Sequence, residues 1–366
     1  MSASKSPCSV KRPAAIVYGC AGLSLTEDER EFFRSADPLG FILFRRNCDN
    51  RDQMRALVAD LRATVGRADA PVLIDQEGGR VARMRPPSWP GHPAARRIGD
   101  LAVGDPEAGA EAAWLNARLL ADMLHDVGIT VDCAPVCDVP VDGSHDVIGD
   151  RAFSDDPELV ASLARISCTG LLDGGVLPVI KHLPGHGRAL CDSHLEQPLV
   201  EASRAELARS DFLPFEVVSD MPLGMVAHVV YSELDPVHPA STSRIVINSV
   251  IRDQIGFDGL LFCDDLSMEA LAGGVAERAL AVLEAGCDVV LHCNGKLEEM
   301  RHLLGVVPPM TDAAMARWER ALTFLQPPGR GDVDAMRERL MGLLEGESLD
   351  GELLDGNRAD GADLVA

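Results

Sequence analysis

The chain has 366 residues, of which 46% are hydrophobic and 25% are charged, enough to bury the cores of two ordinary domains or of one large barrel. Its 57 acidic residues outnumber its 34 basic ones and give a formal net charge of −23, which repels nucleic acid phosphates and anionic lipids. We therefore expect neither a nucleic acid nor a membrane as a partner, and no segment reaches the ~20 apolar residues of a membrane span.

Ten cysteines are spread along the chain without a C-x-x-C pair. Cys133 and Cys137 lie in an expected strand, and we interpret them as core residues rather than metal ligands. An apolar run that ends at Cys20 resembles an export signal, but glycines interrupt it and the bulky Tyr18 lies beside the would-be cleavage point. Because free thiols persist in a reducing compartment, we expect a cytoplasmic protein.

Short apolar strands alternate with helical patterns along most of the chain. Thr26, which precedes an acidic stretch, is expected to cap the first helix. In the first half, strands are expected at residues 14–18, 40–44, 72–75 and 131–136, and helices at 50–64, 106–127 and 156–172. In the second half, strands are expected at residues 175–180, 224–228, 260–263 and 288–291, and helices at 201–218, 243–255 and 275–285.

Strands that are apolar on both faces and alternate with helices predict a parallel sheet. Eight such units close most simply into a single-domain (β/α)8 barrel of the TIM type, an α/β fold. An open doubly wound sheet is the alternative, but no G-x-G-x-x-G pattern follows the first strand. We expect residues 1–12 to be a flexible N-terminus, 13–328 the catalytic barrel, and 329–366 an acidic, largely disordered tail with one helix at 336–344.

Polar side chains follow nearly every expected strand. They are Arg45, Arg46 and Asn47, Asp75, Asp138, Lys181 and His182, His228, Asp264, and His292 with Asn294. Because the carboxyl ends of parallel strands in a closed barrel share one rim, we expect these side chains to surround the active site.

The densest polar cluster is the sequence K-H-L-P-G-H-G at residues 181–187, followed by D-S-H at 192–194. Pro184 opposes both a continued strand and a helix, so we expect the strand to stop before it. Consecutive residues of a strand point to opposite faces, so Lys181 and His182 can serve one pocket only if the strand ends there.

A second motif, F-C-D-D-L-S-M at residues 262–268, places two carboxylates after a strand, and taken alone such a pair usually caps a helix. Together, the two motifs resemble those of the bacterial β-N-acetylglucosaminidases of glycoside hydrolase family 3, which remove N-acetylglucosamine from cell-wall fragments. The family usually has Phe in place of Leu183 and Ser in place of Cys263. The resemblance covers about residues 14–294 and implies the single-domain branch of the family.

This resemblance implies a set of catalytic residues. Asp264 would be the nucleophile and His194 the acid/base catalyst, with Asp192 orienting the histidine. Most glycosidases use two carboxylates, and this branch departs from that pattern. An aspartate two residues away can fix the tautomer of the imidazole and stabilise its protonated form. Asp265 would then be structural.

The resemblance also implies a set of sugar-binding residues: Asp75, Arg83, Arg151, Lys181 and His182. Such groups suit the task because sugar hydroxyls that become buried must all find hydrogen-bond partners. Without the resemblance, Arg83 and Arg151 would be interpreted as surface residues and His194 as a loop histidine. His186 and His228 have no assigned role, although His228, at a strand end, is a candidate for lining the pocket.

The implied activity is that of a retaining, exo-acting β-N-acetylglucosaminidase. Its substrate would be a small muropeptide, N-acetylglucosamine linked to an anhydro-muramic unit, and we expect a monomer without a cofactor or metal. A zinc-dependent amide hydrolase using His182, His186, His194 and Asp264 remains an alternative, although the first strand has no H-x-H pair. A phosphorylase with the same nucleophile and a catalytically silent sugar-binding protein are the others.

Overall fold

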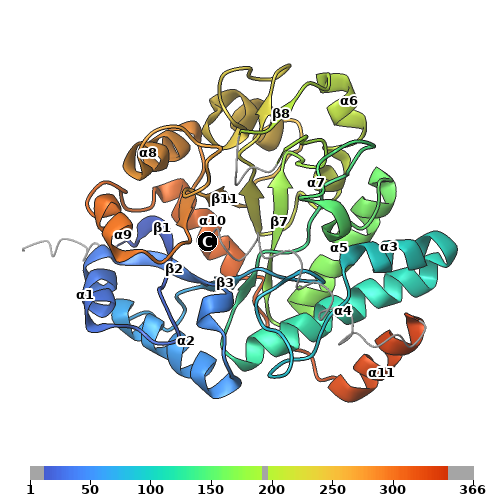
Figure 1. The fold of residues 1–366 in the computed structure, drawn as a ribbon, viewed down its shortest axis with the longest axis horizontal. Helices are drawn as coiled ribbons and strands as arrows, with labels where there is room; N and C mark the ends of the chain where they lie inside the picture. Colours follow the sequence, from blue (N-terminus) through green and yellow to red (C-terminus); the bar gives the residue numbers. More distant parts are fainter. Residues whose placement is uncertain (1–11, 192–196, 345–366) are drawn as a thin grey trace, which may run out of the picture.

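Eight parallel strands close into a barrel in the computed structural model, which describes residues 12–191 and 197–344. Around the barrel the strand order is β1-β12-β11-β9-β7-β6-β3-β2. Helices surround it, as Figure 1 shows. The predicted single-domain (β/α)8 barrel is therefore confirmed, because neighbouring strands run parallel with helices between them.

Each barrel strand corresponds to an apolar run of the sequence. The strands are β1 Ala14–Gly19, β2 Pro38–Leu43, β3 Val72–Ile74, β6 Val131–Asp132, β7 Leu177–Leu183, β9 Leu223–Val226, β11 Leu260–Asp265 and β12 Val289–His292. Two small sheets lie outside the barrel: antiparallel β4 Gln76–Gly78 with β5 Val81–Ala82, and parallel β8 Leu199–Val200 with β10 Val230–Tyr231. Every residue of β2 and β7 is buried, since helices cover one face and the barrel interior fills the other.

The helices of the described residues are α1 Glu27–Ala36, α2 Arg51–Val65, α3 Ala95–Gly104, α4 Pro106–Asp126, α5 Pro157–Asp173, α6 Arg204–Arg209, α7 Leu213–Val217, α8 Val275–Ala285, α9 Leu297–Leu303, α10 Asp312–Leu322 and α11 Val333–Leu343. None of these is long and apolar enough to cross a membrane. Short 3₁₀ turns occur at Arg45–Asn47, Gly149–Arg151 and Ala240–Thr242. The expected cap is confirmed: the side chain of Thr26 accepts a hydrogen bond from the backbone N–H of Glu29, in a capping box.

Two expected helices differ in the structure. The helix predicted at 201–218 is split into α6 and α7, because Pro214 in the first turn of α7 has no N–H to continue a preceding helix. The helix predicted at 243–255 is the π-helix Val246–Arg252, a wider turn than sequence periodicity anticipates. Its β-branched side chains Val246, Ile247, Val250 and Ile251 are all buried.

Helix α11 lies within the range that we expected to be largely disordered, at the position where one helix was predicted (Figure 1). It packs against α4, and Leu340 is buried in a cluster with side chains of α3, α4 and α5. Arg339 forms an ion pair with Glu111 of α4. This part of the tail therefore contacts the barrel helices, and residues 345–366 lie outside the described residues.

Candidate active site

The carboxyl ends of β3, β6, β7 and β11 bring distant parts of the chain to one rim. Asp75 follows β3, Asp138 follows β6, Lys181 and His182 belong to β7, and Asp264 belongs to β11. Parallel strands of a closed barrel end on the same side, which is where such barrels bind substrates.

The ammonium group of Lys181 joins two carboxylates near the rim. Its Nζ lies 2.8 Å from Oδ1 of Asp75 and 2.6 Å from Oε1 of Glu77. Arg83 approaches the other oxygen of Asp75, with Nη2 to Oδ2 at 3.3 Å, and its guanidinium lies over the ring of Phe44. The whole side chain of Lys181 is buried, so the ammonium is held by its partners rather than by water.

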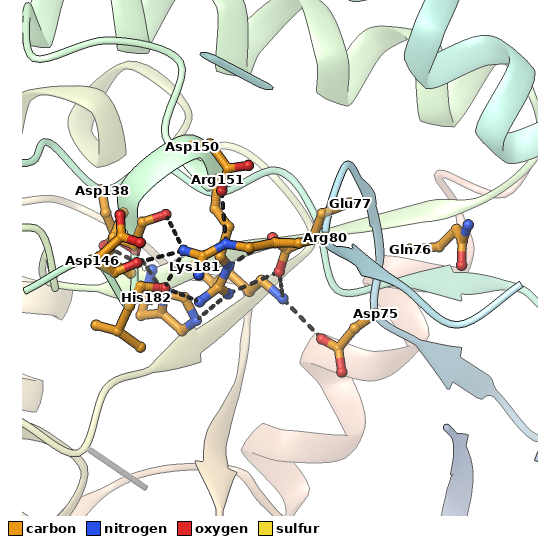
Figure 2. A network of polar contacts seen from close by, with 12 residues as sticks. Asp75, Gln76, Glu77, Arg80, Asp138, Asp146, Asp150, Arg151, Lys181 and His182 are labelled. Atoms are coloured by element: carbon orange, nitrogen blue, oxygen red, sulfur yellow. Dashed lines mark hydrogen bonds and ion pairs between the residues drawn. The ribbon is translucent and has the colours of Figure 1, made fainter. Parts of the chain in front are cut away.

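Arg151 completes this network from the 3₁₀ turn Gly149–Arg151. Its Nε and Nη2 each lie 2.9 Å from an oxygen of Glu77, in a bidentate pair, and Nη1 donates to the carbonyl of Val147 at 3.1 Å. Figure 2 shows Arg151, Glu77 and Lys181 meeting at one point, with Asp75 joined through Lys181. Without the family resemblance, Arg151 would have been interpreted as a surface residue. The structure contradicts that interpretation, because the side chain of Arg151 is part of this network.

The electrostatic environment keeps the network ionised. Burial acts to raise the pKa of Asp75, but the attraction of Lys181 and Arg83 outweighs it and the pKa lies well below its usual range. Burial acts in the same sense on Glu77, yet Arg151 and Lys181 lower its pKa to about 2. For Lys181, burial acts to lower the pKa and the two carboxylates raise it above its usual value. We refer to Asp75, Glu77, Arg83, Arg151 and Lys181 as the rim network.

His182 joins the site through Asp138. Nδ1 of His182 lies 2.6 Å from Oδ2 of Asp138, and both side chains are buried. Burial acts to raise the pKa of Asp138, but His182 lowers it to about 2. Strand β7 runs to Leu183, beyond the end of the strand predicted at residues 175–180, and stops directly before Pro184 as expected. Its pairing with β9 is irregular between Ile180 and Leu183, so side chains there do not follow strict alternation and both Lys181 and His182 reach the site.

The glycines that flank His186 are required by the packing of this loop. Gly185 has φ +134°, a conformation that other residues rarely adopt. A Cβ on Gly187 would lie 2.0 Å from the carbonyl oxygen of Val139. The carbonyl of Gly185 accepts a hydrogen bond from the hydroxyl of Tyr231 at 2.6 Å. Both glycines therefore let the loop after β7 lie close against its neighbours.

Asp264 lies at the end of β11 with a half-buried side chain. Its Oδ1 accepts a hydrogen bond from the backbone N–H of Asp265 at 2.8 Å. Burial lowers the pKa of His186, in the loop after β7, to about 4, and the negative charges of Asp138 and Asp264 oppose this shift. Asp192 and His194 lie outside the described residues, so their position relative to Asp264 stays a prediction.

Asp265 has the structural position that we expected. Its Oδ1 accepts hydrogen bonds from the backbone N–H groups of Ser267 at 3.1 Å and Cys293 at 3.0 Å, which joins the ends of β11 and β12. Burial raises the pKa of Asp265 to about 6, although these N–H groups act in the opposite direction. Oδ2 is buried without a hydrogen-bond partner among the described residues.

Asp265→Asn should make the unfolding free energy of the protein less dependent on pH. A folded-state pKa of about 6, above the ordinary 3.8, means that this group contributes stability at low pH that is lost as the pH rises through about 6. Asparagine does not ionise, so the variant does not lose this stability. From pH 4 to pH 8, the unfolding free energy of the variant should therefore rise by about 2–3 kcal/mol relative to that of the wild type. Urea unfolding of both proteins at the two pH values measures this. A difference that is the same at both would contradict the ionisation of Asp265.

His228 belongs to the core and does not line the pocket. Its side chain is fully buried, Nε2 donates to the carbonyl oxygen of Asp265 at 3.0 Å, and Nδ1 lies 2.7 Å from the hydroxyl of Ser241. Because Nε2 faces a carbonyl, it carries the hydrogen, and Nδ1 accepts from Ser241. His228 thereby holds the backbone next to Asp264.

Sequence reasoning missed the parts played by Glu77 and Asp138. Glu77 stands two residues after Asp75 in the motif I-D-Q-E-G-G-R, and this proximity was the only available signal. Asp138 was recognised as a polar residue at a strand end, but nothing in the sequence connects it to His182, which is 44 residues away. Within residues 12–191 and 197–344, no group of three or more His, Cys, Asp or Glu side chains is arranged to hold a metal ion.

Comparisons with known proteins identify the family of this chain. The family model described as the glycosyl hydrolase family 3 N terminal domain matches residues 20–325. A beta-hexosaminidase of Bordetella avium is 39% identical over 320 residues, 85% of this chain and 90% of the relative, and one of Tolumonas auensis is 41% identical over 313 residues, 81% and 87%.

Among solved structures, NagZ from Neisseria gonorrhoeae in complex with N-trifluoroacetyl-D-glucosamine is 34% identical, with a TM-score of 0.81. The similarity covers 93% of this chain and 98% of the gonococcal one. The family resemblance of the two motifs is thus confirmed over nearly the whole barrel. This protein belongs to glycoside hydrolase family 3 and is a glycoside hydrolase.

Proposed function

We propose that the protein is a retaining, exo-acting β-N-acetylglucosaminidase. One observation supports the proposal most strongly. The carboxylate of Asp264 lies at the same end of the barrel as the buried, ionised rim network, whose charged groups suit a polyhydroxylated ligand. The ammonium of Lys181 donates to Asp75 and pairs with Glu77, and its third hydrogen can donate to a sugar hydroxyl. The oxygens of Asp75 can accept from neighbouring hydroxyls.

The mechanism proceeds in two displacements. Asp264 attacks the anomeric carbon while protonated His194 gives its proton to the leaving oxygen, and an ester forms between Asp264 and the sugar. A water molecule, deprotonated by the same histidine, then cleaves the ester and restores the original anomeric configuration. Asp192 orients His194 through a charge-assisted hydrogen bond.

The substrate class follows from the family and from the ligand of a neighbour. The gonococcal NagZ structure contains N-trifluoroacetyl-D-glucosamine, an N-acylated glucosamine. We infer that the natural substrate is a small muropeptide with N-acetylglucosamine linked to an anhydro-muramic unit, processed during cell-wall recycling. The cytoplasm as the site of action and a monomeric state belong to the same proposal.

Paired aryl β-N-acetylglucosaminide and aryl β-glucoside substrates test this function. We expect release of the aryl group from the N-acetyl sugar at a higher kcat/KM, at equal rates in phosphate and phosphate-free buffers, and in the presence of EDTA. Acceleration by phosphate would identify a phosphorylase, and loss of activity with EDTA would favour the metal-dependent hydrolase. If N-acetylglucosamine raises the Tm but no aryl group is released, the protein is a sugar-binding protein instead.

His194→Ala should affect substrates according to their leaving groups. An activated nitrophenolate departs with little protonation, whereas an alkyl or sugar alkoxide needs a proton donor. We expect kcat/KM to fall by about 10²–10⁴-fold more for the poor leaving group than for the good one. Initial rates on a series of aryl glycosides of graded phenol pKa measure this slope. An equal loss across the series would exclude His194 as the proton donor.

A further inference from the structure

Asp138 is buried beneath His182 and has three hydrogen-bond donors. Its Oδ2 lies 2.6 Å from Nδ1 of His182, and its Oδ1 accepts from the backbone N–H groups of His182 at 3.2 Å and His186 at 2.7 Å. The side chain of Asp138 is 0% exposed, so water cannot replace these donors. Both carboxylate oxygens are therefore committed to the chain segment that begins in β7.

These contacts fix which nitrogen of His182 carries a hydrogen. An ionised carboxylate only accepts, so Nδ1 of His182 must be the donor to Asp138. On the other side of the ring, Nε2 lies 3.4 Å from Nη2 of Arg151. Both residues are drawn in Figure 2. A guanidinium only donates, so a hydrogen on Nε2 would face another hydrogen. Nε2 therefore presents its lone pair.

The lone pair on Nε2 has only a long contact with Arg151, so a hydroxyl of a ligand can compete for it. Nη2 of Arg151 already donates to Glu77 at 2.9 Å, and 3.4 Å is long for a second hydrogen bond from the same nitrogen. The neighbouring cations of the rim network can only donate hydrogen bonds. A sugar hydroxyl both donates and accepts, so it also needs an acceptor, and Nε2 of His182 can be that acceptor. His182 supplies that acceptor only in the tautomer that Asp138 selects.

We propose that Asp138 is a positioning residue that holds His182 with its hydrogen on Nδ1, so that Nε2 accepts a hydrogen bond from a hydroxyl of the bound sugar. This inference rests on the proposed function for the identity of the ligand. The tautomer itself depends only on the protein, so the two can fail separately.

The first test needs only the wild-type protein. Long-range ¹H–¹⁵N correlation spectra of histidine-labelled protein distinguish a protonated Nδ1 from a protonated Nε2, and the His182 signals are identified by their absence in His182→Gln. We expect His182 in the Nδ1-protonated form. A hydrogen on Nε2 would overturn the proposal, whatever the enzyme turns over.

The second test changes the partner. In Asp138→Asn, the amide oxygen can still accept hydrogen bonds from the two backbone N–H groups, but the NH₂ group then faces Nδ1 of His182. Because NH₂ is a donor, Nδ1 must act as the acceptor. The ring hydrogen of His182 therefore moves to Nε2. We expect KM for the aryl N-acetylglucosaminide to rise and kcat/KM to fall by about 10- to 100-fold. The control is Asp150→Asn, another carboxylate of Figure 2, which pairs with Arg80 and does not contact His182. It should change kcat/KM by less than about twofold.

A double-mutant cycle separates this role from a purely structural one. His182→Gln places an amide near the position of Nε2 whose oxygen can accept without any tautomer, so adding Asp138→Asn to it should reduce kcat/KM by less than about threefold. An equal loss in both backgrounds would mean that Asp138 does not act through His182. If the wild type fails to release the aryl group, the proposed function is at fault, while the spectra still decide the tautomer.

Discussion

Replacement of Asp264 with asparagine should lower kcat for an aryl β-N-acetylglucosaminide by at least about 10⁴-fold. The amide is too weak a nucleophile to form the ester with the anomeric carbon. The fold should survive, because the side chain is half-buried and the hydrogen bond from the backbone N–H of Asp265 can be accepted equally by the amide oxygen. Steady-state kinetics together with thermal unfolding separate loss of chemistry from loss of structure.

A small external nucleophile distinguishes a lost nucleophile from a damaged site. Asp264→Gly leaves space at the anomeric carbon, and azide should then restore release of an activated aryl group. Because azide would attack from the side that Asp264 occupied and no second displacement follows, the product should be the α-glycosyl azide. Retention of turnover within about tenfold in Asp264→Asn would show that another group forms the covalent bond.

The barrel could be predicted because burial on both faces leaves a strong mark on the sequence. The run before Asp264 and the run that ends at Ile42 and Leu43 contain almost only apolar residues, as parallel strands between two layers require. Helices were harder to predict where the backbone departs from a regular α-helix. Pro214 divides the segment at 201–218, and the π-helix Val246–Arg252 contains the buried apolar residues that an ordinary helix would also show.

The site was predictable to the extent that single residues carry it. Asp75, Arg83, Arg151, Lys181 and His182 were implied by the family motifs, and the structure brings all five together. The sequence could not predict which side chains pair with one another across the barrel. Glu77 and Asp138 matter because of the side chains they meet, from segments 74 and 44 residues away, and no local pattern encodes those distances.

Lys181→Met should be the most destabilising single change in the rim network. Methionine fills much of the same volume but leaves Asp75 and Glu77 without the ammonium that lies within 2.8 Å of both. Removing one partner of a buried ion pair typically costs about 3–5 kcal/mol of unfolding free energy, although Asp75 keeps Arg83 and Glu77 keeps Arg151. The control is Lys296→Met, whose side chain is 69% exposed and pairs with Glu299 at the surface, where a change of about 0–1 kcal/mol is expected.

The pH dependence shows whether charge or packing is responsible. In the wild type the folded-state pKa values of Asp75 and Glu77 are lowered, so these groups contribute stability above their ordinary values of 3.8 and 4.5 that is lost as the pH falls. Without Lys181 their pKa values should rise toward the ordinary ones, and protonation should remove the need for the ammonium. The deficit of Lys181→Met in urea unfolding should therefore stay constant from about pH 7 to about pH 5 and shrink as the pH falls further toward about 2. A deficit that is constant down to about pH 2 would mean that lost packing, rather than the ion pairs, sets the stability of the rim.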